Sequence, residues 1–167
     1  MINLTLGNIT KEYSTHNLVL IRVVEISSGP VLEVGAGLFS TPLLHWLCKL
    51  HNRRLYTLEN NDDFFYWARQ FRSPGHSIVQ VTKVADFKVK KHWGVVFVDH
   101  DMVDSLRSDD AISFKDSADY IVFHDSDERV YGFKKVKPYF KHVYEWTGCR
   151  PQTAILSNFK ELDNLCL

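Results

Sequence analysis

Two pairs of an acid and a histidine could carry chemistry in the second half of the chain. Asp99 and His100 end one apolar segment, and His124 and Asp125 end another. Free imidazole has a pKa of about 6.5, so either histidine could take a proton from a substrate near neutral pH. Carboxylates and imidazoles also bind divalent metals, which is the second chemistry that these residue types allow.

A turn with two glycines could hold a small molecule earlier in the chain. An apolar segment, residues 30–34, leads into this turn, and a helical pattern follows at once. Backbone N–H groups at such a turn can face a polar ligand, and glycine has no Cβ to keep the ligand away. A dinucleotide fingerprint would have a third glycine in place of Ser40. The candidate contacts are Glu33, Gly35, Ala36, Gly37 and Ser40.

A further acid follows the next apolar segment, residues 54–58. Glu59 stands where a carboxylate at a strand end can accept hydrogen bonds from both hydroxyls of a ribose. NAD-binding proteins use an acid at the same place, so Glu59 indicates a ribose rather than one particular cofactor. The simpler alternative is a surface acid at the end of a strand.

The elements that would position these residues alternate between strands and helices. Apolar segments predict strands over 31–34, 54–58, 78–84, 94–98 and 120–123, and helical spacing predicts helices over 11–27, 41–50, 62–71, 104–114 and 128–137. Asp62 and Asp63 are the expected cap of the third helix. Residues 142–147 and 153–156 predict an antiparallel hairpin. Right-handed crossovers bring the carboxyl ends of parallel strands to one edge, so we expect one site there.

Composition predicts one domain without a strong overall charge. The chain has 167 residues, and its 20 basic and 20 acidic side chains cancel, so a nucleic acid would have to bind a local patch. The basic run over 129–141 is such a patch, because its cations alternate with aromatic residues. The more ordinary interpretation is the solvated face of an amphipathic helix. Three widely spaced cysteines, no signal core and no membrane-length apolar run predict a cytoplasmic protein that does not bind membranes.

Four motifs in order resemble the class I S-adenosylmethionine-dependent methyltransferases. They are the Glu-x-Gly-x-Gly turn at 33–37 and the segments 55–61, 81–87 and 94–100. The resemblance implies an α/β, Rossmann-like fold with a mostly parallel seven-stranded sheet, a C-terminal antiparallel hairpin and helices on both faces. It divides the domain into a lead-in helix (1–29), a cofactor-binding half (30–100), and a substrate half with the closing hairpin (101–167).

The resemblance also implies which residues hold S-adenosylmethionine. The glycine turn would contact the cofactor, Glu59 would bind its ribose, and Asp99 would lie beside the sulfonium. Asp86 and Asn60 would lie near the adenine, although Asp86 could equally cap a helix or lie in a solvated loop.

A metal is a further possibility that the resemblance raises. Catechol-type O-methyltransferases have an Asp after the fourth strand and an Asp-Asn pair after the fifth. Asp99 matches the first ligand, Asp125 falls on the Asn, and His124 replaces the second Asp. An imidazole ligand would favour manganese, iron or zinc over magnesium. In the alternatives, His100 or His124 acts as a base without a metal, or His124 and Asp125 only hold a loop.

The expected reaction is O-methylation of a small hydroxylated molecule. Methyl transfer from a sulfonium needs alignment and a deprotonated acceptor, not a covalent nucleophile. One alternative is ribose 2′-O-methylation of RNA, with Asp99, Lys134 or Lys135, and Glu145 as candidate residues. Another is a non-catalytic subunit that keeps the cofactor fold. The sequence does not indicate an oligomeric state.

Overall fold

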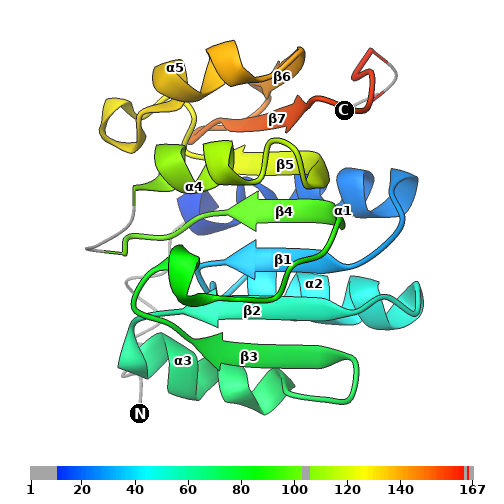
Figure 1. The fold of residues 1–167 in the computed structure, drawn as a ribbon. Helices are drawn as coiled ribbons and strands as arrows, with labels where there is room; N and C mark the ends of the chain where they lie inside the picture. The colour runs from blue at the N-terminus through cyan, green and yellow to red at the C-terminus, as the bar shows by residue number, and fades with distance from the viewer. Residues whose placement is uncertain (1–10, 103–105, 164, 166–167) are drawn as a thin grey trace.

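A seven-stranded sheet forms the centre of the protein, in a computed structural model that describes residues 11–102, 106–163 and 165 (Figure 1). The strands lie in the order β3-β2-β1-β4-β5-β7-β6. Strands β1 to β5 are parallel, and β7 is antiparallel to both of its neighbours. This confirms the expected Rossmann-like sheet and closing hairpin. The bounds are β1 Val31–Val34, β2 Leu55–Glu59, β3 His76–Gln80, β4 Trp93–Val98, β5 Ala118–His124, β6 His142–Trp146 and β7 Thr153–Ser157.

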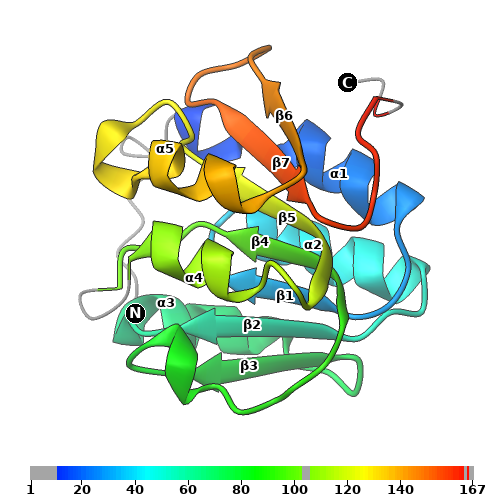
Figure 2. The same cartoon turned by 45° about the horizontal axis from the view of Figure 1, so that its top comes forward.

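Helices cover both faces of the sheet. Helices α1 and α2 lie on one face, and α4 and α5 lie on the other (Figures 1 and 2). Helix α3 packs beside β2 and β3. The bounds are α1 Asn17–Ile26, α2 Ser40–Leu50, α3 Asp62–Ala68, α4 Arg107–Ser113 and α5 Phe133–Val136.

Each face of the sheet has its own apolar core, and alternate residues of a strand serve the two cores. In β4, Val95 and Phe97 face α1 and α2, whereas Val96 and Val98 face α4 and α5. All residues of β1 and β4 are buried. A strand that is covered on both sides has no solvent face, which explains why these strands are almost wholly apolar in the sequence, with Glu33 of β1 as the one charged residue in them.

The segment after β5 is not the single helix that the sequence predicts over 128–137. A short 3-10 helix, η5 (Arg129–Tyr131), ends at Gly132, which has a left-handed φ of 71°. The chain then forms α5 and a second 3-10 turn. Gly132 adopts this conformation without steric cost, and it ends the first turn. Phe133 and Phe140 of the basic run are buried in the core, so they offer no exposed ring to a base.

Helix starts also differ from the expected positions. The lead-in helix begins with a 3-10 turn, η2 (Lys11–Ser14), before α1, and residues 1–10 of the expected lead-in lie outside the described part. Helix α3 is capped by Asn61, whose side chain accepts a hydrogen bond from Phe64 N at 3.1 Å, and not by the aspartates that follow. The fourth expected helix is confirmed over Arg107–Ser113, and residues 104–105 lie outside the described part. Within the described ranges, no helix is long and apolar enough to cross a membrane.

Candidate functional site

The glycine turn after β1 fits tightly against the end of β4. Gly35 has a left-handed φ of 95°, and a Cβ placed on it would lie 2.0 Å from the carbonyl oxygen of Asp99. Its N–H donates to Leu58 O at 2.9 Å, which ties the turn to β2. Only glycine allows this approach, because both the conformation and the contact exclude a side chain.

Glu33 lies beneath this turn and supports it. Its carboxyl group is fully buried and accepts hydrogen bonds from Thr57 Oγ1 at 2.6 Å and from Thr41 Oγ1 at 3.0 Å. Thr41 Oγ1 in turn accepts from Gly37 N at 3.0 Å. Burial raises the pKa of Glu33 to about 7, although the hydroxyls of Thr57, Ser40 and Thr41 oppose that shift. Glu33 and the buried Ser40 therefore hold the turn from below.

Glu59 joins the end of β2 to the top of the turn. Its Oε2 accepts a hydrogen bond from Ala36 N at 2.7 Å. Its Oε1 accepts from Asn60 N at 2.8 Å and from Asn61 N at 2.7 Å. Burial raises its pKa, and the three backbone N–H groups partly offset this effect. A carboxylate offers about four acceptor positions, so this one retains capacity for a further donor.

Asp86 caps a short helix that follows β3, and its place near the adenine stays a prediction. It ends the 3-10 helix η4 (Val84–Asp86), is exposed, and accepts a hydrogen bond from Lys83 N at 3.2 Å. This is the capping role that the sequence left open as an alternative. Asn60 is partly buried next to Glu59, and its backbone N–H, rather than its amide, makes the contact described there.

Asp99 and His124 come together at the carboxyl ends of β4 and β5, and His16 joins them. One potential ligand atom from each of the three residues lies within 4.8 Å of the others. His16 precedes α1, and its ring packs against the rings of Phe97 and His124, with centroid distances of 5.0 and 4.7 Å. Burial lowers the pKa of both histidines to about 4, so both are neutral at neutral pH.

Arg107, the first residue of α4, stands between Asp99 and Asp125. Its Nη1 lies 3.0 Å from Asp99 Oδ1 and 2.8 Å from Asp125 Oδ2. Its Nε donates to the carbonyl oxygen of His100 at 2.6 Å, and its guanidinium carbon lies 3.6 Å from the centroid of the Tyr131 ring. A guanidinium thus bridges the two carboxylates that the sequence assigned to one metal ion. Apart from Arg107, the potential metal-binding atoms that lie close to Asp99 belong to His16 and His124, and not to Asp125.

His100 follows Asp99 in the sequence, but its side chain points toward α4 and not toward His16 and His124. Its Nδ1 accepts a hydrogen bond from Met102 N at 3.2 Å, so the ring proton is on Nε2, which lies 2.9 Å from Asp110 Oδ2 on α4. Both ring nitrogens therefore face protein groups. The structure does not bring His100 together with His124.

The residues proposed for RNA methylation have separate partners. Lys135 pairs with Asp109, Glu145 pairs with Lys137, and Asp99 pairs with Arg107. Lys134, the other candidate lysine, is exposed, and the assignment of this set to RNA methylation stays a prediction.

Sequence reasoning missed His16 and Arg107. Each lies at the start of a helix, and the two helices pack on opposite faces of the sheet. The sequence contains one signal for them: each lies in the first half of a predicted helix, 11–27 or 104–114, and helices that pack on a parallel sheet begin near the carboxyl ends of the strands. That signal identifies neither residue as a partner of Asp99.

Solved methyltransferase structures share this arrangement of strands and helices. The precorrin-6y C5,15-methyltransferase of Geobacter metallireducens aligns over 87% of this chain and 89% of its own, at 12% identity and a TM-score of 0.64. A Staphylococcus aureus protein described as a caffeoyl-CoA O-methyltransferase aligns over 83% and 80%, at 11% identity and a TM-score of 0.61. The METTL16 methyltransferase domain aligns over 86% and 68%, at 15% identity and a TM-score of 0.62.

These structural matches define the class of fold. At identities of 11 to 15% they show the fold alone, and that fold is the Rossmann-like fold of class I methyltransferases. No protein-family model and no curated protein matches the sequence.

Proposed function

We propose that this protein is an S-adenosylmethionine-dependent methyltransferase that acts on the hydroxyl group of a small molecule. One observation carries the proposal: the Gly35 turn, bonded to Glu59, lies at the same sheet edge as the Asp99 and His124 pair. This edge offers a cofactor site beside polar groups that can act on an acceptor. The fold of the neighbours supports the class, and the O-methyltransferase among them supports the acceptor type.

The residues present fit the cofactor. A Cβ at Gly35 would collide with the end of β4, and a Cβ at Gly37 would lie 2.6 Å from Ser40 Oγ, so the two glycines let the turn pack closely against β4 and the start of α2. Glu59 retains an acceptor position for one ribose hydroxyl. When bound, S-adenosylmethionine supplies a methyl group on a positively charged sulfur.

The chain's own residues would orient the acceptor and remove its proton. Asp99 lies at the switch between the cofactor half and the substrate half, where a carboxylate favours the positive sulfonium. His124 is held by Thr153, whose Oγ1 lies 3.1 Å from Nδ1, and by Asp125, whose Oδ1 lies 3.2 Å from Nε2. A fixed, neutral imidazole beside a carboxylate is suited to hold a hydroxyl group in line for transfer.

Calorimetry with S-adenosylhomocysteine tests the cofactor assignment. We expect the wild-type protein to bind it, and Glu59→Gln to weaken binding at least about tenfold, because a neutral amide is a poorer acceptor for a ribose hydroxyl than a carboxylate is. The exposed Glu25→Gln is the matched control and should bind as the wild type does. Binding of NAD without binding of either sulfur cofactor would show that the assignment is wrong.

Transfer of a labelled methyl group tests the acceptor class. Small phenols and alcohols should accept the label in the presence of the folded protein. Transfer to RNA alone would favour ribose methylation, and cofactor binding without transfer to any acceptor would favour a non-catalytic subunit.

A further inference from the structure

The most unusual group at the carboxyl edge of the sheet is His16. Its side chain is 2% exposed, and neither ring nitrogen has a hydrogen-bond partner among the residues that the structure describes. Leaving a buried donor or acceptor without a partner costs about 1–3 kcal/mol. A buried polar group of this kind calls for an explanation, and a ligand from outside the chain would supply the missing partner.

The ring of His16 faces two other potential ligands. His124 contacts it edge to face, and one ligand atom each from His16, Asp99 and His124 falls within 4.8 Å of the others. All three residues come from different elements: the start of α1, the end of β4 and the end of β5. Their rings and carboxylate are placed by packing, since His16 also lies against Phe97 of the core.

The charge around this cluster also fits a cation. The carboxylates of Asp99 and Asp125 share Arg107 Nη1, at 3.0 and 2.8 Å, and both are mostly shielded from solvent. One guanidinium neutralises one of them and leaves one negative charge when both are ionised. A cation on the histidine side of Asp99 would balance that charge, whereas Asp101 is mostly exposed to solvent.

We propose that His16, Asp99 and His124 form a binding site for a divalent first-row transition metal. Two imidazoles and one carboxylate suit manganese, iron, cobalt or zinc, whereas magnesium prefers oxygen ligands in octahedral geometry. Three protein ligands leave coordination positions for water or for a substrate oxygen. The set differs from the one expected from the sequence, because His16 replaces Asp125, which Arg107 already holds.

The site's position assigns it a role in the proposed reaction. A metal there would lie beside the switch between the two halves of the sheet, where an acceptor hydroxyl has to lose its proton. Metal coordination lowers the pKa of a bound hydroxyl group and fixes its orientation. The binding claim itself does not depend on the proposed function, because metal binding can be measured without cofactor or acceptor.

Titration of the metal-free protein with Co²⁺ tests the site directly. We expect one Co²⁺ per chain, a visible ligand-field absorption band, and retention of the ion in the presence of a large excess of Mg²⁺. His16→Phe keeps the aromatic packing against Phe97 and should lower Co²⁺ affinity at least about tenfold. The exposed His51→Phe is the matched control and should leave affinity unchanged.

Two further variants keep the test decisive if His16→Phe unfolds. Asp99→Asn should also lose the Co²⁺ band, and Asp125→Asn should weaken binding less than Asp99→Asn does. Circular dichroism would confirm that each variant is folded. The proposal is overturned by an absence of Co²⁺ binding to the wild type, by displacement with Mg²⁺, or by a greater loss in Asp125→Asn than in Asp99→Asn. Failure here would leave S-adenosylhomocysteine binding intact, so the two proposals fail separately.

Discussion

At the scale of single residues, burial makes the ionised form of the Glu33 carboxyl group unfavourable. It is fully buried beneath the glycine turn, and the hydroxyls of Thr41 and Thr57 are its main hydrogen-bond partners. Hydroxyls can donate to the ionised form and accept from the protonated form. Burial nevertheless dominates, which is why the pKa of Glu33 rises from 4.5 to about 7.

This shift predicts a pH dependence of stability. Between pH 4.5 and about 7 the folded protein keeps a proton on Glu33 that the unfolded chain releases. The stabilising contribution is therefore complete below pH 4.5 and is lost as the pH rises through 7. Glu33→Gln removes the ionisation, so its free energy of unfolding relative to wild type should rise by about 3 kcal/mol across this window. Urea unfolding at several pH values measures the difference, with Glu25→Gln as the exposed control; parallel wild-type and Glu33→Gln profiles would contradict it.

The site was only partly predictable at this scale. Local spacing identified the glycine turn and the strand-end residues Glu59, Asp99 and His124, because a strand followed by a polar residue is a local pattern. His16 and Arg107 reach Asp99 from helices on opposite faces of the sheet. Which helical residue faces a strand end depends on packing between distant segments, and the sequence pattern does not report it.

At the scale of elements, strands were more predictable than helices. The apolar segments at 31–34 and 94–98 predicted the bounds of β1 and β4 to within a residue or two, because both strands are covered on both faces. β3 was expected over 78–84, but it spans His76–Gln80, and Val84 lies in the short helix η4, where it is buried in the core on the α4 and α5 side of the sheet. The helix expected over 128–137 is interrupted at Gly132, since a left-handed residue cannot continue a helix.

The close contact between the turn after β1 and the end of β4 predicts that a side chain at Gly35 would lower the stability of the protein. Gly35→Ala would place a methyl group 2.0 Å from Asp99 O at a φ of 95°, so we expect a loss of at least about 2 kcal/mol in the free energy of unfolding. Gly75→Ala is the control, since a Cβ there has its nearest neighbour, Arg53 O, at 4.0 Å. Denaturant unfolding of both variants checks this. Equal stabilities would mean that the turn can move away from β4.

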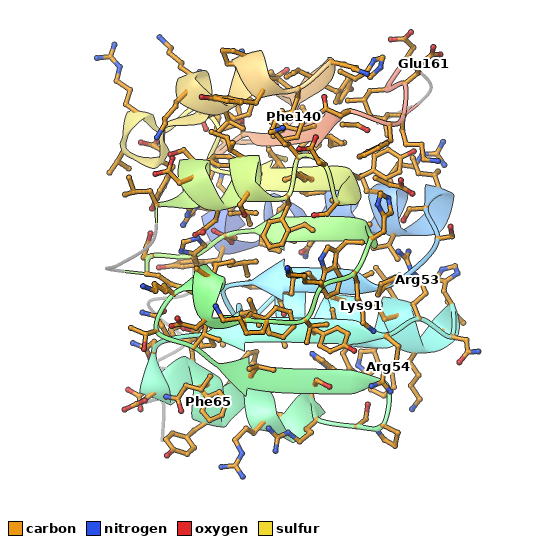
Figure 3. All side chains as sticks on the ribbon, in the orientation of Figure 1. Arg53, Arg54, Phe65, Lys91, Phe140 and Glu161 are labelled. Atoms are coloured by element: carbon orange, nitrogen blue, oxygen red, sulfur yellow. The ribbon has the colours of Figure 1, made fainter. Side chains whose placement is uncertain are left out.

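At the scale of the whole molecule, the two edges of the sheet have different tasks. The carboxyl edge carries the glycine turn, Glu59 and the Asp99 cluster. The amino edge carries Arg53, a buried side chain whose Nε donates to Gly29 O at 2.6 Å and whose Nη1 donates to Val24 O at 2.8 Å. Arg53 thereby joins the end of α1 and the turn before β1 to the start of β2 (Figure 3).

Because Arg53 and the candidate cofactor site lie at opposite edges of the sheet, a substitution of Arg53 should lower the stability of the protein without weakening cofactor binding. Arg53→Met keeps much of the side chain's volume but removes the guanidinium that donates to the carbonyl oxygens of Val24, Ser28 and Gly29, so we expect a loss of at least about 3 kcal/mol in the free energy of unfolding. Arg54→Met is the matched control, because Arg54 is exposed at the same edge, where its guanidinium donates to Pro74 O (Figure 3). It should change stability by less than about 1 kcal/mol.

Binding should respond differently from stability in the Arg53→Met variant. At a temperature where it remains folded, calorimetry should give an S-adenosylhomocysteine affinity within about twofold of wild type, because none of the groups that Arg53 bonds belongs to the glycine turn or to Glu59. A lower melting temperature with unchanged affinity is the expected pair of results. If affinity instead falls in step with stability, the two edges are coupled through β1 and β2, and the amino edge helps to set the geometry of the cofactor site.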